Sequence, residues 1–143
     1  MSGNTITFDY ISYPASRKPI LRPVANLTFE YFETKTSFYA LIDSGADYSV
    51  SFEEFGRALG IKLDEDAVED VEGVATNVKA YRHHITVSIN GHKVYLDVLW
   101  LKKKFDAGRD FPFIIGRQPF FDKFDITFRQ SKRKFYLEPV IQI

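Results

Sequence analysis

Residues 41–47 have the sequence Leu41-Ile42-Asp43-Ser44-Gly45-Ala46-Asp47, in which an apolar run gives way to turn-forming residues. The run is the end of an expected strand, so the chain presents the Asp43 carboxylate on a tight turn. Glycine at position 45 permits that turn, and its backbone N–H is able to donate to the carboxylate. Asp-Ser-Gly alone is common in ordinary turns, so its significance depends on the rest of the chain.

The tripeptide Asp-Ser-Gly occurs once in the 143 residues. Hydrolysis of a peptide bond by carboxylates requires two of them close together, sharing one proton and holding a water molecule between them. The protonated carboxyl polarises the peptide carbonyl, while the ionised one takes a proton from the attacking water. A chain with one such carboxylate can therefore form the pair only with a second copy of itself, across a twofold axis.

A second motif follows later in the chain, where Phe113 precedes Ile114-Ile115-Gly116-Arg117. Together the two motifs resemble those of the retropepsin-like aspartic proteases, the single-lobe family that includes the retroviral proteases, over about residues 27–137. The resemblance implies an all-β domain, a closed barrel-like acid-protease fold with one or two short helices. It also implies a homodimeric aspartic endopeptidase that hydrolyses a peptide or protein substrate with a dyad of two Asp43 carboxylates.

The resemblance also assigns roles to individual residues. Asp43 is the catalytic aspartate, Ser44 supplies a hydroxyl that joins the two turns, and Gly45 is a turn residue whose carbonyl can meet the substrate. Gly116 and Arg117 are implied as structural support, with Arg117 paired to Asp47 in a partly buried position near the cleft. A flap hairpin is implied around residues 71–77. Contacts with substrate are implied for Ala46, Asp47, Gly73, Val74, Ala75 and Ile115.

Position 46 also bears on pH dependence. Two-lobed pepsin-like enzymes usually carry Ser or Thr after the glycine, and that hydroxyl stabilises the ionised dyad and lowers its pKa. Alanine at position 46 removes this donor. We therefore expect an activity optimum in mildly acidic to near-neutral conditions.

The pattern along the chain predicts strands joined by short turns. Alternating runs rich in β-branched and aromatic residues predict strands at residues 6–11, 24–31, 37–42, 85–89, 93–100, 111–115, 124–128 and 135–138. Asn90-Gly91 predicts a tight hairpin turn. A capping-box pattern that begins at Ser51 and a glycine at position 60 predict a short helix over residues 52–59. A second short helix is expected at residues 119–123.

Length and composition predict a single domain of residues 1–143. The family resemblance implies a core of about residues 27–137 and an N-terminal extension over residues 1–26. Lys and Arg balance Asp and Glu at 19 each, so we expect neither nucleic acid nor a membrane as a partner. No signal peptide or membrane span is visible, which predicts a cytoplasmic location. No cofactor is expected, and no metal either, since His83 and His84 should point to opposite faces of a strand.

Two alternatives compete with the enzyme. The same fold could serve as a catalytically inactive peptide-binding or dimerisation module, and the intact Asp43, Ser44 and Gly45 favour the enzyme over it. The chain could also be an unrelated β-barrel binding domain in which both motifs are coincidental.

Overall fold

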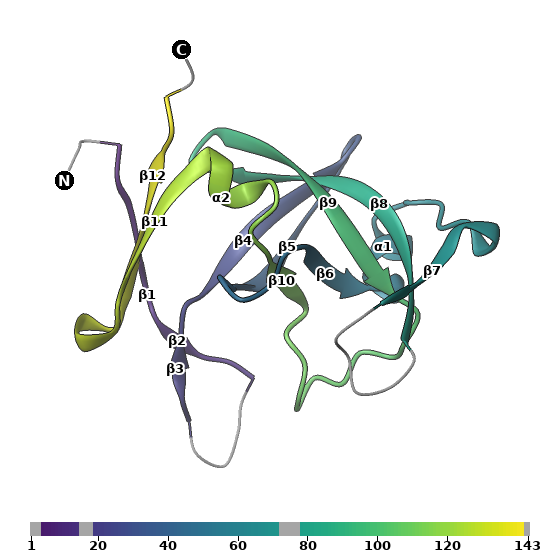
Figure 1. Cartoon of the computed structure of the whole chain (residues 1–143), viewed down its shortest axis with the longest axis horizontal. Helices are drawn as coiled ribbons and strands as arrows, with labels where there is room; N and C mark the ends of the chain where they lie inside the picture. Colours follow the sequence, from purple (N-terminus) through teal and green to yellow (C-terminus); the bar gives the residue numbers. More distant parts are fainter. Residues whose placement is uncertain (1–3, 15–18, 72–77, 142–143) are drawn as a thin grey trace.

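A computed structural model describes residues 4–14, 19–71 and 78–141, and Figure 1 shows how its strands and helices are arranged. Strands dominate, as the sequence predicts. They are β1 (Ile6–Asp9), β2 (Ile11–Ser12), β3 (Leu21–Arg22), β4 (Val24–Tyr31), β5 (Thr34–Ile42), β6 (Ser49–Phe52), β7 (Val68–Val71), β8 (Val78–Ile89), β9 (His92–Leu101), β10 (Phe113–Ile115), β11 (Phe124–Arg129) and β12 (Lys134–Pro139). The helices are α1 (Glu53–Ala58) and α2 (Phe120–Lys123), with 3-10 turns η1 (Glu65–Ala67) and η2 (Gln130–Lys132).

Six strands close into a barrel in the order β4-β5-β10-β6-β9-β8, because β8 also pairs with β4. The seventh strand of this sheet, β7, lies outside the barrel and pairs with the first residues of β8. Two of the pairings are parallel, β5 with β10 and β6 with β9. The first of these places Ile115 beside Ile42, so the residues that follow each strand leave the barrel side by side.

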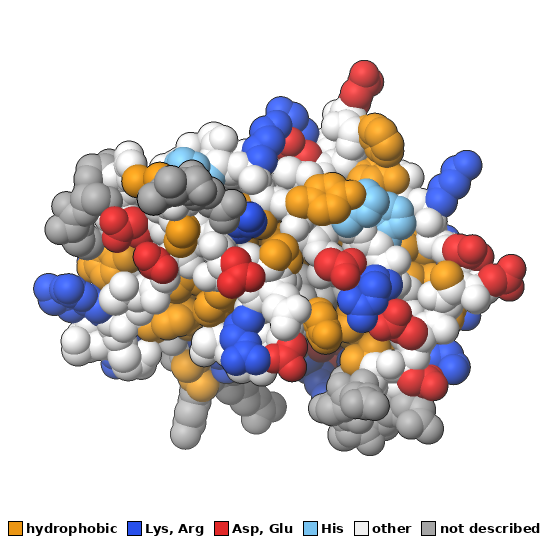
Figure 2. Space-filling view, turned by 45° about the horizontal axis from the view of Figure 1, so that its top comes forward, with side chains coloured by type: hydrophobic (Ala, Val, Ile, Leu, Met, Phe, Trp, Pro, Cys, Tyr) orange, Lys and Arg blue, Asp and Glu red, His pale blue; other side chains and the backbone are white. Residues whose placement is uncertain are grey.

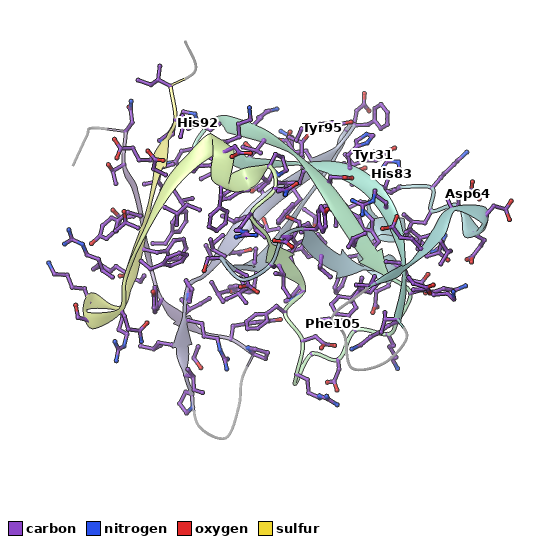
Figure 3. The ribbon with its side chains drawn as sticks, viewed as in Figure 1. Tyr31, Asp64, His83, His92, Tyr95 and Phe105 are labelled. Atoms are coloured by element: carbon purple, nitrogen blue, oxygen red, sulfur yellow. The ribbon has the colours of Figure 1, made fainter. Side chains whose placement is uncertain are left out.

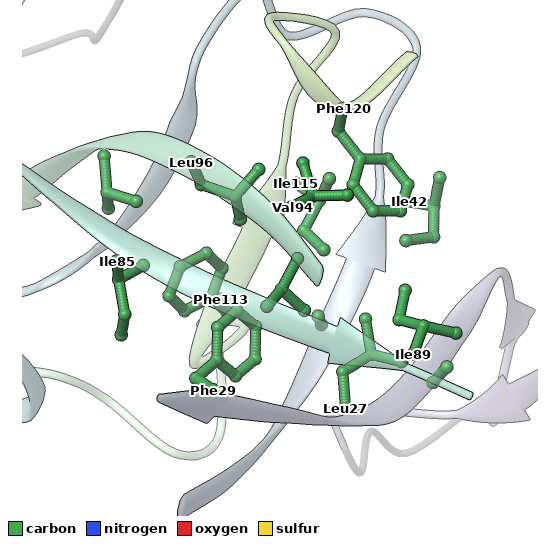
Figure 4. Close-up of a cluster of buried hydrophobic side chains, with 14 of the residues drawn as sticks. Leu27, Phe29, Ile42, Ile85, Ile89, Val94, Leu96, Phe113, Ile115 and Phe120 are labelled. Carbon is green, nitrogen blue, oxygen red and sulfur yellow. The ribbon is translucent and has the colours of Figure 1, made fainter. Parts of the chain in front are cut away.

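The barrel interior is filled by aliphatic and aromatic side chains (Figure 4). Phe29 stacks on Phe113 with ring centroids 4.1 Å apart, and the Trp100 ring meets Phe113 edge-on at 6.0 Å. All three side chains are fully buried. Burial of one such side chain contributes about 1.5–3 kcal/mol to folding, so the interior is a strong anchor for the strand ends that surround it.

The two ends of the chain form a separate three-stranded sheet beside the barrel, in the order β1-β12-β11 (Figure 1). Phe8 of β1 stacks on Phe135 of β12 with centroids 4.9 Å apart. Within one copy, β12 is hydrogen-bonded to β1 on one edge and to β11 on the other.

Several local predictions are confirmed, and the capping box is wrong. Asn90 and Gly91 both have positive φ, as the two-residue hairpin turn requires. Helix α1 ends before Gly60, whose φ is +86° and whose N–H donates to the Arg57 carbonyl. No side chain caps the start of α1. Ser51 is instead buried in β6, where its hydroxyl donates to the Pro112 carbonyl at 2.7 Å.

The two adjacent histidines also differ from expectation. The rings of His83 and His84 lie 4.5 Å apart rather than on opposite faces of β8. Here β8 passes from its pairing with β7 to its pairing with β4, and His83 Nδ1 folds back to 3.0 Å from the His84 carbonyl oxygen. The edge of the Tyr31 ring meets His83 at 5.6 Å, while His84 stacks on the exposed Tyr95 at 4.5 Å (Figure 3). Histidine and hydrophobic side chains accordingly gather on one outer face of the molecule (Figure 2).

Within the described parts of the chain, neither α1 nor α2 has the length and apolar character that a membrane crossing demands.

Candidate active site

The turn that follows β5 holds the Asp43 carboxylate in a fixed position. The Asp43 N–H donates to the Ile115 carbonyl at 2.9 Å, which ties the start of the turn to β10. The Gly45 N–H donates to Asp43 Oδ1 at 2.9 Å, as predicted, and the Ala46 N–H donates to the Asp43 carbonyl at 3.2 Å. Asp43 is half-buried, whereas Ser44 and Gly45 are exposed in the single chain. The carboxylate is thus oriented by backbone while the tip of the turn stays free.

The Gly-Arg motif runs directly beside this turn. The Arg117 N–H donates to the Ala46 carbonyl at 2.8 Å, and the Gln118 N–H donates to the Asp47 carbonyl at 2.9 Å. Gly116 is buried, and its N–H donates to the Ser49 hydroxyl at 3.2 Å. The two motifs that are far apart in sequence therefore form one hydrogen-bonded unit.

Arg117 and Asp47 form the predicted ion pair, with Arg117 Nη2 against Asp47 Oδ1. Their side chains are 54% and 59% exposed, so the expectation of a partly buried pair is wrong for the single chain. Both residues are exposed in the single chain, in the segments that follow β5 and β10, so their side chains remain in contact with solvent. Such an exposed pair is worth at most about 1 kcal/mol.

A cavity opens next to the turn that carries Asp43, and its volume of about 750 Å³ is within the range of ligand-binding clefts. Its apolar wall comes from β6, β9 and β10, and its charged rim from the turn and from β7 and β8. The lining residues are Gly45, Ala46, Asp47, Tyr48, Val50, Glu69, Asp70, Val71, Arg82, Leu99, Leu101 and Ile114. Hereafter this cavity is called the main cleft.

Only some of the residues expected to contact substrate line the main cleft. Ala46 and Asp47 line the main cleft. Ile115 does not, because its side chain is fully buried in the barrel core; its neighbour Ile114 faces the cleft instead. This alternation follows from the period of a strand, in which adjacent side chains point to opposite faces. Gly73, Val74 and Ala75 lie outside the described residues.

Arg82 is a cleft residue that the sequence reasoning missed. Its guanidinium donates two hydrogen bonds to Glu69 (2.8 and 3.2 Å) and one to Asp97 (3.0 Å), and it lies 5.1 Å from the centre of the Tyr48 ring. The hydrogen bonds with Glu69 raise the Arg82 pKa, and burial opposes this only in part. No signal in the sequence indicated this residue, because only the pairing of β7 with β8 brings residues 69 and 82 to diagonal positions on neighbouring strands.

Comparison with solved structures identifies the architecture. The fold is similar to a retropepsin-like aspartic protease from Rickettsia conorii, with a TM-score of 0.58, 17% identity, and coverage of 93% of this chain and 90% of that one. The chain has the retropepsin-like fold.

Two further structures share the retropepsin-like fold. The EIAV protease in complex with an inhibitor has a TM-score of 0.53 and 22% identity, covering 71% of this chain and 86% of that one. The retroviral protease-like domain of Ddi1 from Leishmania major has a TM-score of 0.55 and 12% identity, covering 82% and 94%. No protein-family model and no curated protein sequence matches the chain. The three structural similarities contradict the alternative of a β-barrel with a different fold.

Proposed function

We propose that this chain is an aspartic endopeptidase that works as a homodimer, with one Asp43 carboxylate from each copy. The observation that carries the proposal is the position of Asp43. On a retropepsin-like fold, its carboxylate is oriented by the Gly45 N–H, in a turn whose next residues, Gly45 to Asp47, line a cleft of ligand-binding size. The exposed Ser44 and Gly45 at the tip of the turn support contact with a second copy at this point.

The proposed mechanism uses the chain's own residues and one water molecule. Two carboxylates brought close together cannot both ionise, so they share one proton and titrate as a pair. The protonated Asp43 donates a hydrogen bond to the carbonyl of the bond to be cut, and its ionised partner removes a proton from water as the water attacks. An extended peptide would lie along the main clefts of the two copies, with Ala46 and Asp47 beside its backbone.

Cleavage of a library of unstructured peptides tests the activity. We expect cleavage by the wild-type protein, loss of cleavage in Asp43→Asn, and inhibition by pepstatin-like compounds. Asp122→Asn is the matched control, since Asp122 is an exposed carboxylate on α2 and outside the main cleft. If the wild type cleaves nothing between about pH 3 and pH 8, the inactive peptide-binding or dimerisation module is the better account.

A mixing experiment tests whether each active site needs two chains. Adding excess Asp43→Asn protein to a fixed amount of wild type should draw wild-type chains into mixed dimers with one aspartate and reduce the activity. Asp122→Asn added in the same amount should not reduce it. Activity that is unaffected by the Asp43→Asn chain would contradict a shared dyad, and sedimentation at several concentrations would then show whether dimers form at all.

A further inference from the structure

A smaller hollow of about 150 Å³ adjoins the main cleft and shares three residues with it, Val50, Leu101 and Ile114. The other residues that line this hollow are Phe52, Lys103, Arg109, Asp110 and Phe111. We call it the side pocket. Because the two hollows share a wall, a peptide in the main cleft has a route for one of its side chains into the side pocket.

The side pocket differs from the main cleft in its unpaired positive charge. Along the main cleft, Asp47, Glu69 and Asp70 each form an ion pair, with Arg117, Arg82 and Lys79 respectively. Lys103 and Arg109 form no side-chain hydrogen bond or ion pair with any residue in the ranges that the structure describes.

One carboxylate also lines the side pocket, that of Asp110. Asp110 Oδ2 already accepts the Asp106 N–H at 3.0 Å. The side pocket thus has two cations and one carboxylate, and both cations are open to a ligand. Lys103 and Arg109 also line a larger hollow of about 550 Å³, and both residues are exposed to solvent.

The segment that carries the two cations is held in place between β9 and β10. The Phe105 N–H donates to Glu54 Oε1 of α1 at 2.8 Å, and the Phe105 ring lies 5.0 Å from Phe55 (Figure 3). At the other end, the buried Ser51 hydroxyl holds the Pro112 carbonyl at 2.7 Å. Because the backbone is held at these points, a ligand that meets Lys103 and Arg109 would need to order their side chains but little of the backbone.

The N-terminal extension supports the same segment from outside. The Arg22 guanidinium lies 5.6 Å from the centre of the Phe111 ring, and the Tyr13 ring lies 6.2 Å from it. Arg22 also donates to the Tyr13 carbonyl at 3.2 Å. This part of the chain therefore braces the wall of the side pocket.

We propose that the side pocket is a subsite for a glutamate side chain of the peptide substrate, with Lys103 and Arg109 as specificity-determining residues. The apolar surface of Phe52, Leu101 and Ile114 suits the methylene groups of a glutamate, and the two cations suit its carboxylate. The assignment rests on the proposed function, because a peptide reaches the side pocket only if the main cleft binds one.

The test uses peptides that share one cleavage site and differ only in carrying Glu, Gln or Lys at each flanking position in turn. At one position we expect kcat/KM for Glu to exceed that for Gln by roughly two- to fivefold, a preference that weakens with added salt. Arg109→Glu and Lys103→Glu should each remove the preference for Glu at that position, and the double variant should favour Lys there. Lys62→Glu, at an exposed lysine outside both hollows, is the matched control and should keep the wild-type preference.

The outcomes separate this proposal from the proposed function. Cleavage with no preference for Glu at any position, or a preference that Arg109→Glu and Lys103→Glu leave unchanged, overturns the subsite while the endopeptidase stands. If no peptide is cleaved, the endopeptidase proposal fails. Binding of the same peptides, labelled with a fluorophore, then tests the glutamate subsite separately. Tighter binding of the Glu peptide that is lost in Arg109→Glu supports it, and equal binding of the Glu and Gln peptides overturns it. Thermal unfolding of each variant checks that the fold is intact.

Discussion

Gly116 lies directly against the main chain of Tyr48, with no space between the two for a side chain. A Cβ atom at position 116 would overlap the Tyr48 carbonyl group and would come within 2.9 Å of the Ala46 carbonyl oxygen. This contact is what allows the segment after β10 to hydrogen-bond with the turn that carries Asp43. Position 116 therefore requires a residue without a side chain. The atoms that a Cβ would meet belong to the backbone of Tyr48 and Ala46, which cannot rotate away as a side chain could.

Gly116→Ala should destabilise the protein by about 3 kcal/mol, because the added methyl group meets backbone on two sides. The free energy of unfolding, measured in urea, tests this. Gly108→Ala is the matched control: its Cβ would lie 3.5 Å from Asp106 Oδ1, an ordinary contact, and we expect a change below about 1 kcal/mol. Equal effects of the two substitutions would contradict the close packing at Gly116.

Gly45→Ala should affect activity far more than stability. Its Cβ would lie 3.2 Å from Asp43 Oδ1, so the carboxylate must shift by a few tenths of an ångström. The side chain can move, which keeps the cost to folding small, but a catalytic carboxylate out of position should lower kcat by roughly 10- to 100-fold. Steady-state kinetics and a melting curve on the same preparation test this. A large drop in melting temperature with unchanged kcat per folded molecule would reverse the interpretation.

Ala46→Ser should move the acidic limb of the pH–rate profile to lower pH. A hydroxyl at position 46 would add a donor beside the dyad, and a donor stabilises the ionised form and lowers the pKa at which the pair loses its proton. The profile of kcat/KM against pH for the two proteins measures the shift. A limb that stays in place, or a wild-type optimum near pH 2, contradicts the role given to Ala46.

His84 should make the folded state less stable in mild acid. Burial lowers the pKa of His84 below its ordinary value of 6.5, the neighbouring His83 lowers it further, and Asp97 opposes both. As the pH falls through about 6.5, the unfolded chain takes up a proton before the folded one does, so the free energy of unfolding decreases until the folded pKa is passed. Urea unfolding at several pH values between 5 and 8 should show a smaller decrease for His84→Gln than for wild type.

The exposed His92 offers the control for this measurement. His92→Gln lies at the start of β9, away from the stacked rings, and should leave the decrease attributed to His84 in place. An identical pH dependence in His84→Gln and wild type would show that His84 does not contribute.

The sequence was sufficient for much of the local structure and for the turn that carries Asp43. Alternation predicted most strands, Asn90-Gly91 predicted its hairpin, and Asp-Ser-Gly predicted the turn in which the Gly45 N–H donates to Asp43. These features depend on residues that are neighbours in the chain. The acidic stretch of residues 64–71, in contrast, did not predict η1 and β7. Its charged residues do not alternate as those of a typical strand do, and β7 is held by its pairing with β8.

What could not be predicted depends on contacts between distant segments. The parallel pairing of β5 with β10 decides that Ile114 faces the main cleft and Ile115 the core. Arg82 finds Glu69 and Asp97 on two different strands, and Lys103 and Arg109 reach the side pocket only because α1 and β6 hold their segment. The neighbouring histidines lie on the part of β8 between its pairing with β7, which ends at Tyr81, and its pairing with β4, which begins at Thr86.

The placement of β12 between β1 and β11 has a consequence for how two copies would meet. Within one copy both edges of β12 are already paired, so the unpaired edges of this sheet, among the described residues, belong to β1 and β11. If the chain dimerises as proposed, two folded copies should associate without prior unfolding, at about 10⁵–10⁷ M⁻¹s⁻¹, the ordinary range for docking of folded surfaces.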